Sequence, residues 1–235
     1  MKTIGLLGGM SWESTVPYYQ IINRTIAEKL GGLHSAKLLL YSVDFEEIEA
    51  MQRADRWAAA GSLLSDAARL LEGAGADFLV LCTNTMHRVA PDIEAQIGIP
   101  LLHIADPTAR AIRARGFSSV GLLGTRFTME QDFYRGRLES RFGLSVHVPT
   151  AGSRQLVHEV IYSELCRGVV SEPSRAAFRE VVSELVGMGV EAVILGCTEI
   201  GLLLRPDDVS VPLFDTTALH ARTAATFSLG EDVGA

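Results

Sequence analysis

The sequence has few of the residues that metal, disulfide and Schiff-base chemistry requires. Its 235 residues include three cysteines, Cys82, Cys166 and Cys197, and three lysines. Three cysteines cannot form a complete set of disulfides, and none has the spacing of a metal-ligand pair. No lysine lies in a convincing setting for a Schiff base with pyridoxal phosphate. We therefore expect a protein that works without a metal or any other cofactor.

Basic clusters and long apolar runs are missing as well. The net charge of −7 and the pI near 5.4 argue against a nucleic-acid partner. No apolar stretch approaches the roughly 20 residues that a membrane-spanning helix needs. Lys2 is followed by a short, glycine-rich run, which is not typical of a secretory signal. We expect a soluble, reduced, cytoplasmic protein that binds neither nucleic acid nor membrane.

Short apolar runs alternate with amphipathic segments along the chain. The runs are continuously apolar, as is typical of parallel strands that are covered on both faces. Amphipathic segments such as 57–72 and 176–188 end near glycine and indicate helices. The alternation predicts βαβ units and an α/β fold. The expected strands are residues 2–7, 36–41, 77–81, 100–103, 119–123, 144–148, 191–195 and 211–214.

The second half of the chain repeats the first. Three segments recur in the same order at nearly constant offsets of 116, 114 and 112 residues, which is rare by chance. The matched pairs are 4–8 with 120–124, 73–81 with 187–195, and 99–102 with 211–214. We predict two similar α/β lobes with mostly parallel sheets related by pseudo-twofold symmetry. The lobes are 1–106 and 107–214, and segment 215–235 is able to pack back on the first.

The repeat also predicts which residues oppose each other. Ligands of open parallel sheets bind beyond the carboxyl ends of the strands. Two halves that face each other would bring the segments after corresponding strands to one cleft. The offset of 114 residues pairs Thr83 with Cys197. We therefore expect the active site between the lobes, with Thr83 on one face of a small ligand and Cys197 on the other.

Cys197 is the cysteine best placed for chemistry. It follows a buried strand and opens a short helix, where backbone N–H groups favour the thiolate. A free thiol has a pKa near 8.5, so forming the thiolate at pH 7 costs about 2 kcal/mol. Most lone cysteines are small core residues. We interpret Cys166, in an expected helix, and Cys82, whose side chain points away from that of Thr83, in this way.

Four motifs together resemble the aspartate/glutamate racemase family, and the resemblance covers essentially the whole chain. The motifs are Gly8-Gly9-Met10, Thr83-Asn84-Thr85-Met86-His87, Gly124-Thr125 and Gly196-Cys197-Thr198-Glu199. The resemblance implies an isomerase: a two-lobed amino-acid racemase, usually a homodimer, that uses neither pyridoxal phosphate nor metal. It further implies two cysteines that flank the substrate α-carbon, one removing its proton and the other returning a proton to the opposite face.

The resemblance also implies the residues that hold the substrate. Asn84, Thr85 and Thr198 match positions that bind the α-carboxylate and the amine, and Thr125 and Thr128 match further hydroxyl contacts. The complete expected set for substrate binding is Met10, Gln52, Asn84, Thr85, Thr125, Thr128 and Thr198, with His87 and Glu199 in support.

The sequence departs from the family pattern at one of the two bases. The family motif reads Cys-Asn-Thr, whereas Thr83 takes the cysteine's place here. A hydroxyl is a far weaker acid than a thiol and therefore a poor base. It either transfers a proton itself or relays one with a water or His87 behind it. Since the family pattern implies that Cys197 acts on the L-enantiomer, we expect faster turnover from L to D.

A second departure leaves the substrate open. Aspartate-preferring relatives carry a lysine where Cys166 falls and an arginine near Glu49, and neither cation is at its aligned place here. The substrate is therefore aspartate, glutamate or a broader set of amino acids. One alternative is a decarboxylase of malonates, which needs only a single cysteine. Another is a two-lobed binding protein, which would have no reason to place a thiol at Cys197.

Overall fold

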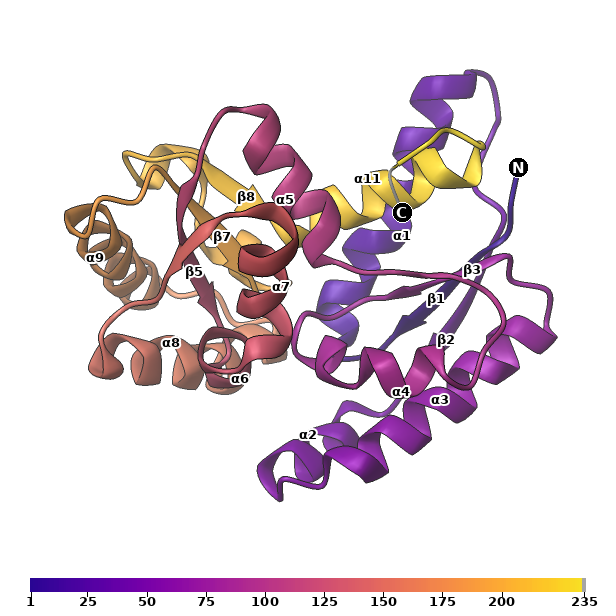
Figure 1. Cartoon of the computed structure of the whole chain (residues 1–235), viewed down its shortest axis with the longest axis horizontal. Coiled ribbons are helices and arrows are strands. Elements are labelled where there is room, and N and C mark those ends of the chain that lie inside the picture. Colours follow the sequence, from indigo (N-terminus) through magenta and orange to yellow (C-terminus); the bar gives the residue numbers. More distant parts are fainter. Residues whose placement is uncertain (234–235) are drawn as a thin grey trace. The chain divides into compact units, whose positions relative to one another are not determined.

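Two parallel four-stranded sheets organise the chain in the computed structural model, which describes residues 1–233 (Figure 1). The first sheet has the order β2-β1-β3-β4, and the second has the order β6-β5-β7-β8. The strands are β1 (Ile4–Gly8), β2 (Leu38–Ser42), β3 (Phe78–Leu81), β4 (Leu101–Leu102), β5 (Ser119–Gly124), β6 (Ser145–His147), β7 (Ala192–Gly196) and β8 (Leu213–Asp215). Each of the eight predicted runs overlaps a strand, so the predicted α/β fold is confirmed.

The chain divides into two units. Unit 1 comprises Met1–Ile104 and the chain from His220 onward, and unit 2 comprises Ala105–Leu219. The last residues of the predicted segment 215–235, namely 234 and 235, lie outside the described residues. Helices of unit 1 are α1 (Trp12–Leu30), α2 (Phe45–Arg53), α3 (Trp57–Gly73), η1 (Thr85–Val89) and α4 (Ala90–Glu94). Helix α11 (Thr216–Ser228) starts in unit 2 and continues in unit 1.

The two sheets have the same internal plan, as the repeat predicts. Strand β1 pairs with β2 and β3, and β5 pairs with β6 and β7, in parallel throughout. Strands β3 and β7 therefore occupy equivalent places, each between the central strand and a short edge strand. The segments that follow β3 and β7 carry Thr83 and Cys197 respectively.

One face of the first sheet is covered by α1 and α11, which lie side by side (Figure 1). Alternate residues of β1 and β3 point to this face, as the period of a strand requires. Burying each such aliphatic side chain contributes about 1.5–3 kcal/mol. The cluster contains Ile4, Leu6, Tyr18, Ile22, Ile26, Phe78, Val80, Cys82, Leu102, Ala221, Ala224 and Ala225.

Strand β2 differs from the expectation that every strand is covered on both faces. Its Leu40 and Tyr41 are 46% and 39% exposed. The reason is its position, since β2 is an edge strand of the first sheet and pairs only with β1. A continuous apolar run in the sequence does not distinguish such an edge strand from a central one.

Unit 2 is built in the same way around its own sheet. Its helices are α5 (Ala105–Ala114), α6 (Arg126–Glu130), α7 (Asp132–Phe142), α8 (Ala151–Ser163), η2 (Leu165–Arg167), α9 (Glu172–Gly187), α10 (Ile200–Leu203) and η3 (Pro206–Asp208). Helix α9 packs so closely on β5 that a Cβ at Gly121 would lie 2.8 Å from the Leu185 side chain. It begins four residues before the predicted 176–188, because Ser171 caps its start and accepts the Ser174 N–H.

No helix within residues 1–233 combines the length and the apolar character that crossing a membrane requires.

Candidate active site

The predicted site residues fall into two sets, one in each unit. In unit 1, Met10 follows β1, the Thr83 segment follows β3, and Gln52 comes from α2. In unit 2, Thr125 follows β5 and the Cys197 segment follows β7. Apart from Gln52, both sets thus lie at the carboxyl ends of the two inner strands of their own sheet, where open parallel sheets bind ligands.

Thr83 is held in place through its backbone by His87. The Nδ1 atom of His87 lies 2.7 Å from the Thr83 carbonyl oxygen, and its Nε2 accepts the Ile104 N–H at 3.1 Å. Because Nε2 accepts a hydrogen bond, the ring proton is on Nδ1 and the imidazole is neutral. Both ring nitrogens are therefore engaged with the backbone, and His87 serves to fix the Thr83 turn.

His87 belongs to a buried group of three histidines. Its ring centroid lies 4.4 Å from that of His103 and 6.1 Å from that of His220. His220 donates from Nε2 to the Leu102 carbonyl at 2.9 Å, and its Nδ1 accepts the Tyr18 hydroxyl at 2.9 Å. The sequence indicates only His87 as a residue near the site. His103 and His220 are distant from it in the chain and come close to it only through the fold.

Gln52 and the first glycine turn border this set. The Gln52 side chain is buried, and its Nε2 donates to the Met86 sulfur at 3.0 Å, which ties α2 to η1. Gly9 has a φ of +92°, and a Cβ there would lie 2.3 Å from the Val43 carbonyl oxygen. Only glycine fits this backbone, and the turn leaves Met10 buried beside the end of β1.

A pair of glycines brings the second set together. Gly124 and Gly196 are register partners at the ends of β5 and β7. A Cβ on Gly124 would lie 2.7 Å from the Gly196 carbonyl oxygen, so a side chain would force the strand ends apart. Thr125 and Cys197 therefore leave adjacent strand ends. Thr125 also caps α6, where its hydroxyl lies 3.2 Å from that of Thr128.

Cys197 is in direct contact with a buried carboxylate. Its Sγ donates to Oε2 of Glu199 at 2.9 Å, and the Thr198 hydroxyl donates to the same oxygen at 2.8 Å. Cys197 is 8% exposed and Glu199 is 2% exposed. Burial and then the neighbouring Glu199 charge raise the pKa of the Cys197 thiol well above its ordinary value. Cys197 therefore rests as a thiol that faces a base.

The expected support of the Cys197 thiolate by backbone N–H groups is present but outweighed, since a backbone hydrogen bond from Glu199 lowers the pKa of the thiol less than burial and the Glu199 charge raise it. Helix α10 has only four residues, and Cys197 contributes to it a carbonyl that accepts the Ile200 N–H. The dipole of so short a helix is small. Burial and the adjacent Glu199 carboxylate outweigh it, and both favour the protonated sulfur.

The other two cysteines have different surroundings. Cys82 is fully buried in the core of unit 1, and burial raises its pKa far above the ordinary value, so the prediction of a packing role is confirmed. Cys166 does not fit its prediction as an ordinary core residue of a helix. It lies in η2, beyond the end of α8, and its Sγ donates to Oε1 of Glu199 at 3.7 Å.

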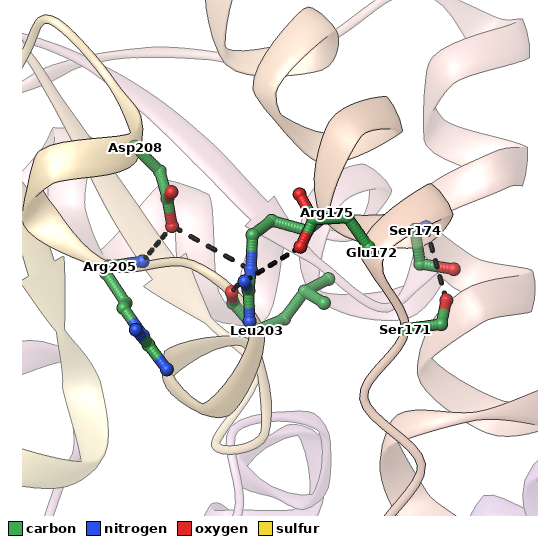
Figure 2. A network of polar contacts seen from close by, with 7 residues as sticks. All are labelled: Ser171, Glu172, Ser174, Arg175, Leu203, Arg205 and Asp208. Carbon is green, nitrogen blue, oxygen red and sulfur yellow. Dashed lines mark hydrogen bonds and ion pairs between the residues drawn. The ribbon is translucent and has the colours of Figure 1, made fainter.

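The first turn of α9 anchors the segment that follows Cys197. Figure 2 shows the guanidinium of Arg175 between Leu203 and Asp208. Its Nε donates to the Leu203 carbonyl at 2.8 Å and lies 4.0 Å from an oxygen of Asp208. Leu203 is the last residue of α10, and a basic side chain that binds the last carbonyl of a helix caps it. Helix α10 is too short to be stable without such a contact. Sequence reasoning missed Arg175.

Within residues 1–233, no three His, Cys, Asp or Glu side chains are grouped so that they could hold a metal ion. The two sets supply instead a thiol–carboxylate pair, hydroxyls and an amide. These groups can transfer protons and hold a small polar ligand.

Comparison with known proteins gives a family. Residues 7–224 match the family described as Asp/Glu/Hydantoin racemase. A broad specificity amino-acid racemase from Bacillus subtilis (strain 168) is 24% identical, over 95% of this chain and 96% of its own.

Two crystal structures each align with 97% of this chain and with the whole length of their own chain. One is of a Yersinia pestis protein described as an Asp/Glu racemase, with 57% identity and a TM-score of 0.90. The other is of an aspartate racemase homologue from Pyrococcus horikoshii OT3, with 34% identity and a TM-score of 0.82. The predicted isomerase class is confirmed, and the chain belongs to the Asp/Glu/hydantoin racemase family.

Proposed function

We propose that this protein racemises an amino acid without a cofactor, by proton transfer on both faces of the α-carbon. Cys197 acts as the thiol base and acid on one face, and Thr83 takes the opposite slot. The observation that carries the proposal is the buried contact of 2.9 Å between the Cys197 sulfur and Glu199, in a chain of the racemase family. The substrate is aspartate, glutamate or a broader set of amino acids.

The first step activates Cys197. Since its pKa is raised, a thiolate forms at neutral pH only if the proton has an acceptor in contact. Glu199 Oε2 is such an acceptor, and it takes the thiol proton. The thiolate then removes the α-proton of the L-enantiomer, and the two electrons of the C–H bond stay on the α-carbon as a carbanion.

The second step returns a proton to the other face. Thr83 supplies it from its hydroxyl, a water molecule returns a proton to the Thr83 oxygen, and the proton held by Glu199 passes to the hydroxide that remains, so that thiol, carboxylate and hydroxyl are all restored. His87 fixes the Thr83 turn through its carbonyl and does not itself move the proton. Because a threonine hydroxyl is a poor base, removal of the α-proton from the D-enantiomer is slow. Turnover from L to D is accordingly faster than from D to L.

The remaining residues hold the substrate. Asn84, Thr85 and Thr198 bind the α-carboxylate and the amine, and Thr125 and Thr128 add hydroxyl contacts. Met10 and Gln52 border the ligand from unit 1. All seven are buried, and a few buried polar groups are what fixes the orientation of a small ligand in its site. We further propose that the protein is cytoplasmic, as its composition leads us to expect, and that it is a homodimer, as the resemblance implies.

A second function shares the same groups. With Cys197 as the single reactive thiol and a hydroxyl at Thr83, the chain has what a malonate decarboxylase requires. There, carbon dioxide leaves first, and the Cys197 thiol protonates the enolate that remains. The observation in its favour is the thiol form in which Cys197 rests.

A screen in deuterated water separates the two functions. The whole purified chain is incubated with single L- and D-amino acids, and chiral chromatography and mass spectrometry follow the products. We expect D-product with one α-deuterium and no need for added pyridoxal phosphate or metal. Release of carbon dioxide from a malonate without any racemisation would establish the decarboxylase instead.

A further inference from the structure

Glu199 lies between two thiols, although the proposed chemistry uses only one. Its Oε2 accepts from Cys197 at 2.9 Å, and its Oε1 accepts from Cys166 at 3.7 Å. Thr198 also donates to Oε2. All four residues belong to unit 2, so that unit alone contains the arrangement.

Cys166 acts on Glu199 only as a donor. Burial raises the pKa of the Cys166 thiol, and the Glu199 charge and the hydrogen bond between the two groups raise it further. The sulfur therefore keeps its proton, and its S–H points at the carboxylate. A donor on one oxygen favours the charged form of a carboxylate.

We propose that Cys166 is a positioning residue that restrains proton transfer from Cys197 to Glu199. Its hydrogen bond occupies Oε1 and holds Oε2 toward the Cys197 sulfur as a hydrogen-bond acceptor, and so keeps Cys197 in the thiol form in the resting protein. The inference rests on the proposed function, in which Glu199 accepts the Cys197 proton. It assigns to Cys166 control over how much thiolate is present.

The turn that carries Cys166 is itself held firmly. The Glu164 carboxylate accepts hydrogen bonds from the hydroxyls of Ser171 at 2.9 Å and Ser174 at 2.8 Å, at the start of α9. The Arg167 N–H donates to the Glu164 carbonyl and closes the η2 turn. The distance between Cys166 and Glu199 is thus set by packed secondary structure, as a positioning role requires.

The test measures the rate at which iodoacetamide alkylates Cys197 in the whole chain at neutral pH, with Cys197 followed by peptide mass spectrometry. Cys166→Ala removes the donor, and we expect an alkylation rate about three- to tenfold higher than wild type. Cys166→Val removes the donor but fills the space, and the same increase should follow. Cys166→Ser keeps a donor, and its rate should not exceed that of wild type.

A second background isolates the role of the carboxylate. In a Glu199→Gln chain, Cys166→Ala should leave the alkylation rate unchanged, because there is no charge left for Cys166 to stabilise. An unchanged or lower rate in both Cys166→Ala and Cys166→Val, with cooperative unfolding intact, would overturn the inference. So would an equal increase in the Glu199→Gln background, because it would indicate a packing effect.

The racemisation screen keeps this test separate from the proposed function. If the chain racemises an amino acid but the alkylation rates do not follow the predicted order, only the role of Cys166 is refuted. If the order holds but no amino acid is racemised, Cys166 still restrains the Cys197 thiol, and the proposed reaction is wrong.

Discussion

The thiol of Cys197 and the carboxylate of Glu199 form a buried acid–base pair, two residues apart in the chain and joined by a hydrogen bond of 2.9 Å. The charge on Glu199 favours a protonated sulfur, yet its oxygen is also the nearest acceptor for the sulfur's proton. The pair therefore keeps Cys197 as a thiol at rest, and transfer of the thiol proton to Glu199 would give the thiolate. This double role of Glu199 leads to the first prediction.

Glu199→Gln should separate the reactivity of Cys197 from its activity. Removing the charge removes one cause of the raised pKa, so alkylation of Cys197 should begin at lower pH than in wild type. Racemisation should nevertheless fall about 10²- to 10⁴-fold, since the proton acceptor is lost. Measuring both against pH checks the prediction. An activity near that of wild type would show that the thiol proton goes elsewhere.

Substitution of Cys197 and of Cys82 should have different effects. Cys197→Ser should lose most activity, because a hydroxyl cannot supply a comparable population of base at neutral pH. Cys82→Ser places a hydroxyl in an apolar core and should lower the free energy of unfolding by about 1–3 kcal/mol, with little effect on rate. Urea unfolding and initial rates check the pair. Full turnover by Cys197→Ser would refute the mechanism.

His87→Phe tests whether His87 positions Thr83 or carries a proton. The ring shape is kept, but the Ile104 N–H and the Thr83 carbonyl lose their partner, which should cost about 1–3 kcal/mol of stability. Racemisation should fall severalfold through displacement of Thr83, while exchange of the L-substrate α-hydrogen continues. Complete loss of racemisation with unchanged unfolding would instead identify His87 as the proton relay.

Arg175→Met tests the cap on α10. Losing the bond to the Leu203 carbonyl loosens the segment that begins at Cys197, so kcat should fall about three- to tenfold with little change in KM. Arg179→Met, one turn further along α9 on the exposed side, is the matched control and should keep wild-type kcat. Equal effects of the two substitutions would exclude a positioning role for Arg175.

The sequence predicts the sheets well and the site only partly. Continuous apolar runs and the internal repeat identify all eight strands, because strands of a covered parallel sheet consist of consecutive apolar residues. Such a run can be recognised within one short segment of the sequence. The motifs after β3 and β7 point to Thr83 and Cys197 as candidate site residues, because the end of a strand can be recognised from the sequence around it. The exposure of β2 cannot be read this way, since it depends on the place of the strand in the sheet.

The missed contacts join residues that are far apart in the chain. Cys166 and Glu199 are 33 residues apart, and Arg175 and Leu203 are 28 apart. No periodicity links such pairs, and each depends on where a short turn ends. The raised pKa of the Cys197 thiol cannot be read from the sequence for a related reason. A single sequence shows that Glu199 follows the thiol, but it does not show that the carboxylate turns back onto the sulfur.

The asymmetry between the two faces gives the last prediction. In the proposed mechanism, Cys197 takes the α-proton of the L-enantiomer, whereas the reverse reaction begins at Thr83, whose hydroxyl is a poor base. Racemisation has an equilibrium constant of about unity, so kcat/KM must match in the two directions. The slower turnover from D to L must therefore come with a lower Michaelis constant.

Two substitutions of Thr83 test this asymmetry. Thr83→Cys restores a pair of thiols where the buried site accepts the sulfur. It should raise the kcat of the reaction that starts from the D-enantiomer relative to the kcat of the reaction that starts from the L-enantiomer. Thr83→Ala should abolish racemisation but keep exchange of the L-substrate α-hydrogen in deuterated water, because Cys197 still acts on its own face. Chiral chromatography and mass spectrometry measure both. Equal wild-type kcat in the two directions, together with full racemisation by Thr83→Ala, would show that Thr83 is not the second catalytic residue and that the pairing inferred from the repeat is wrong.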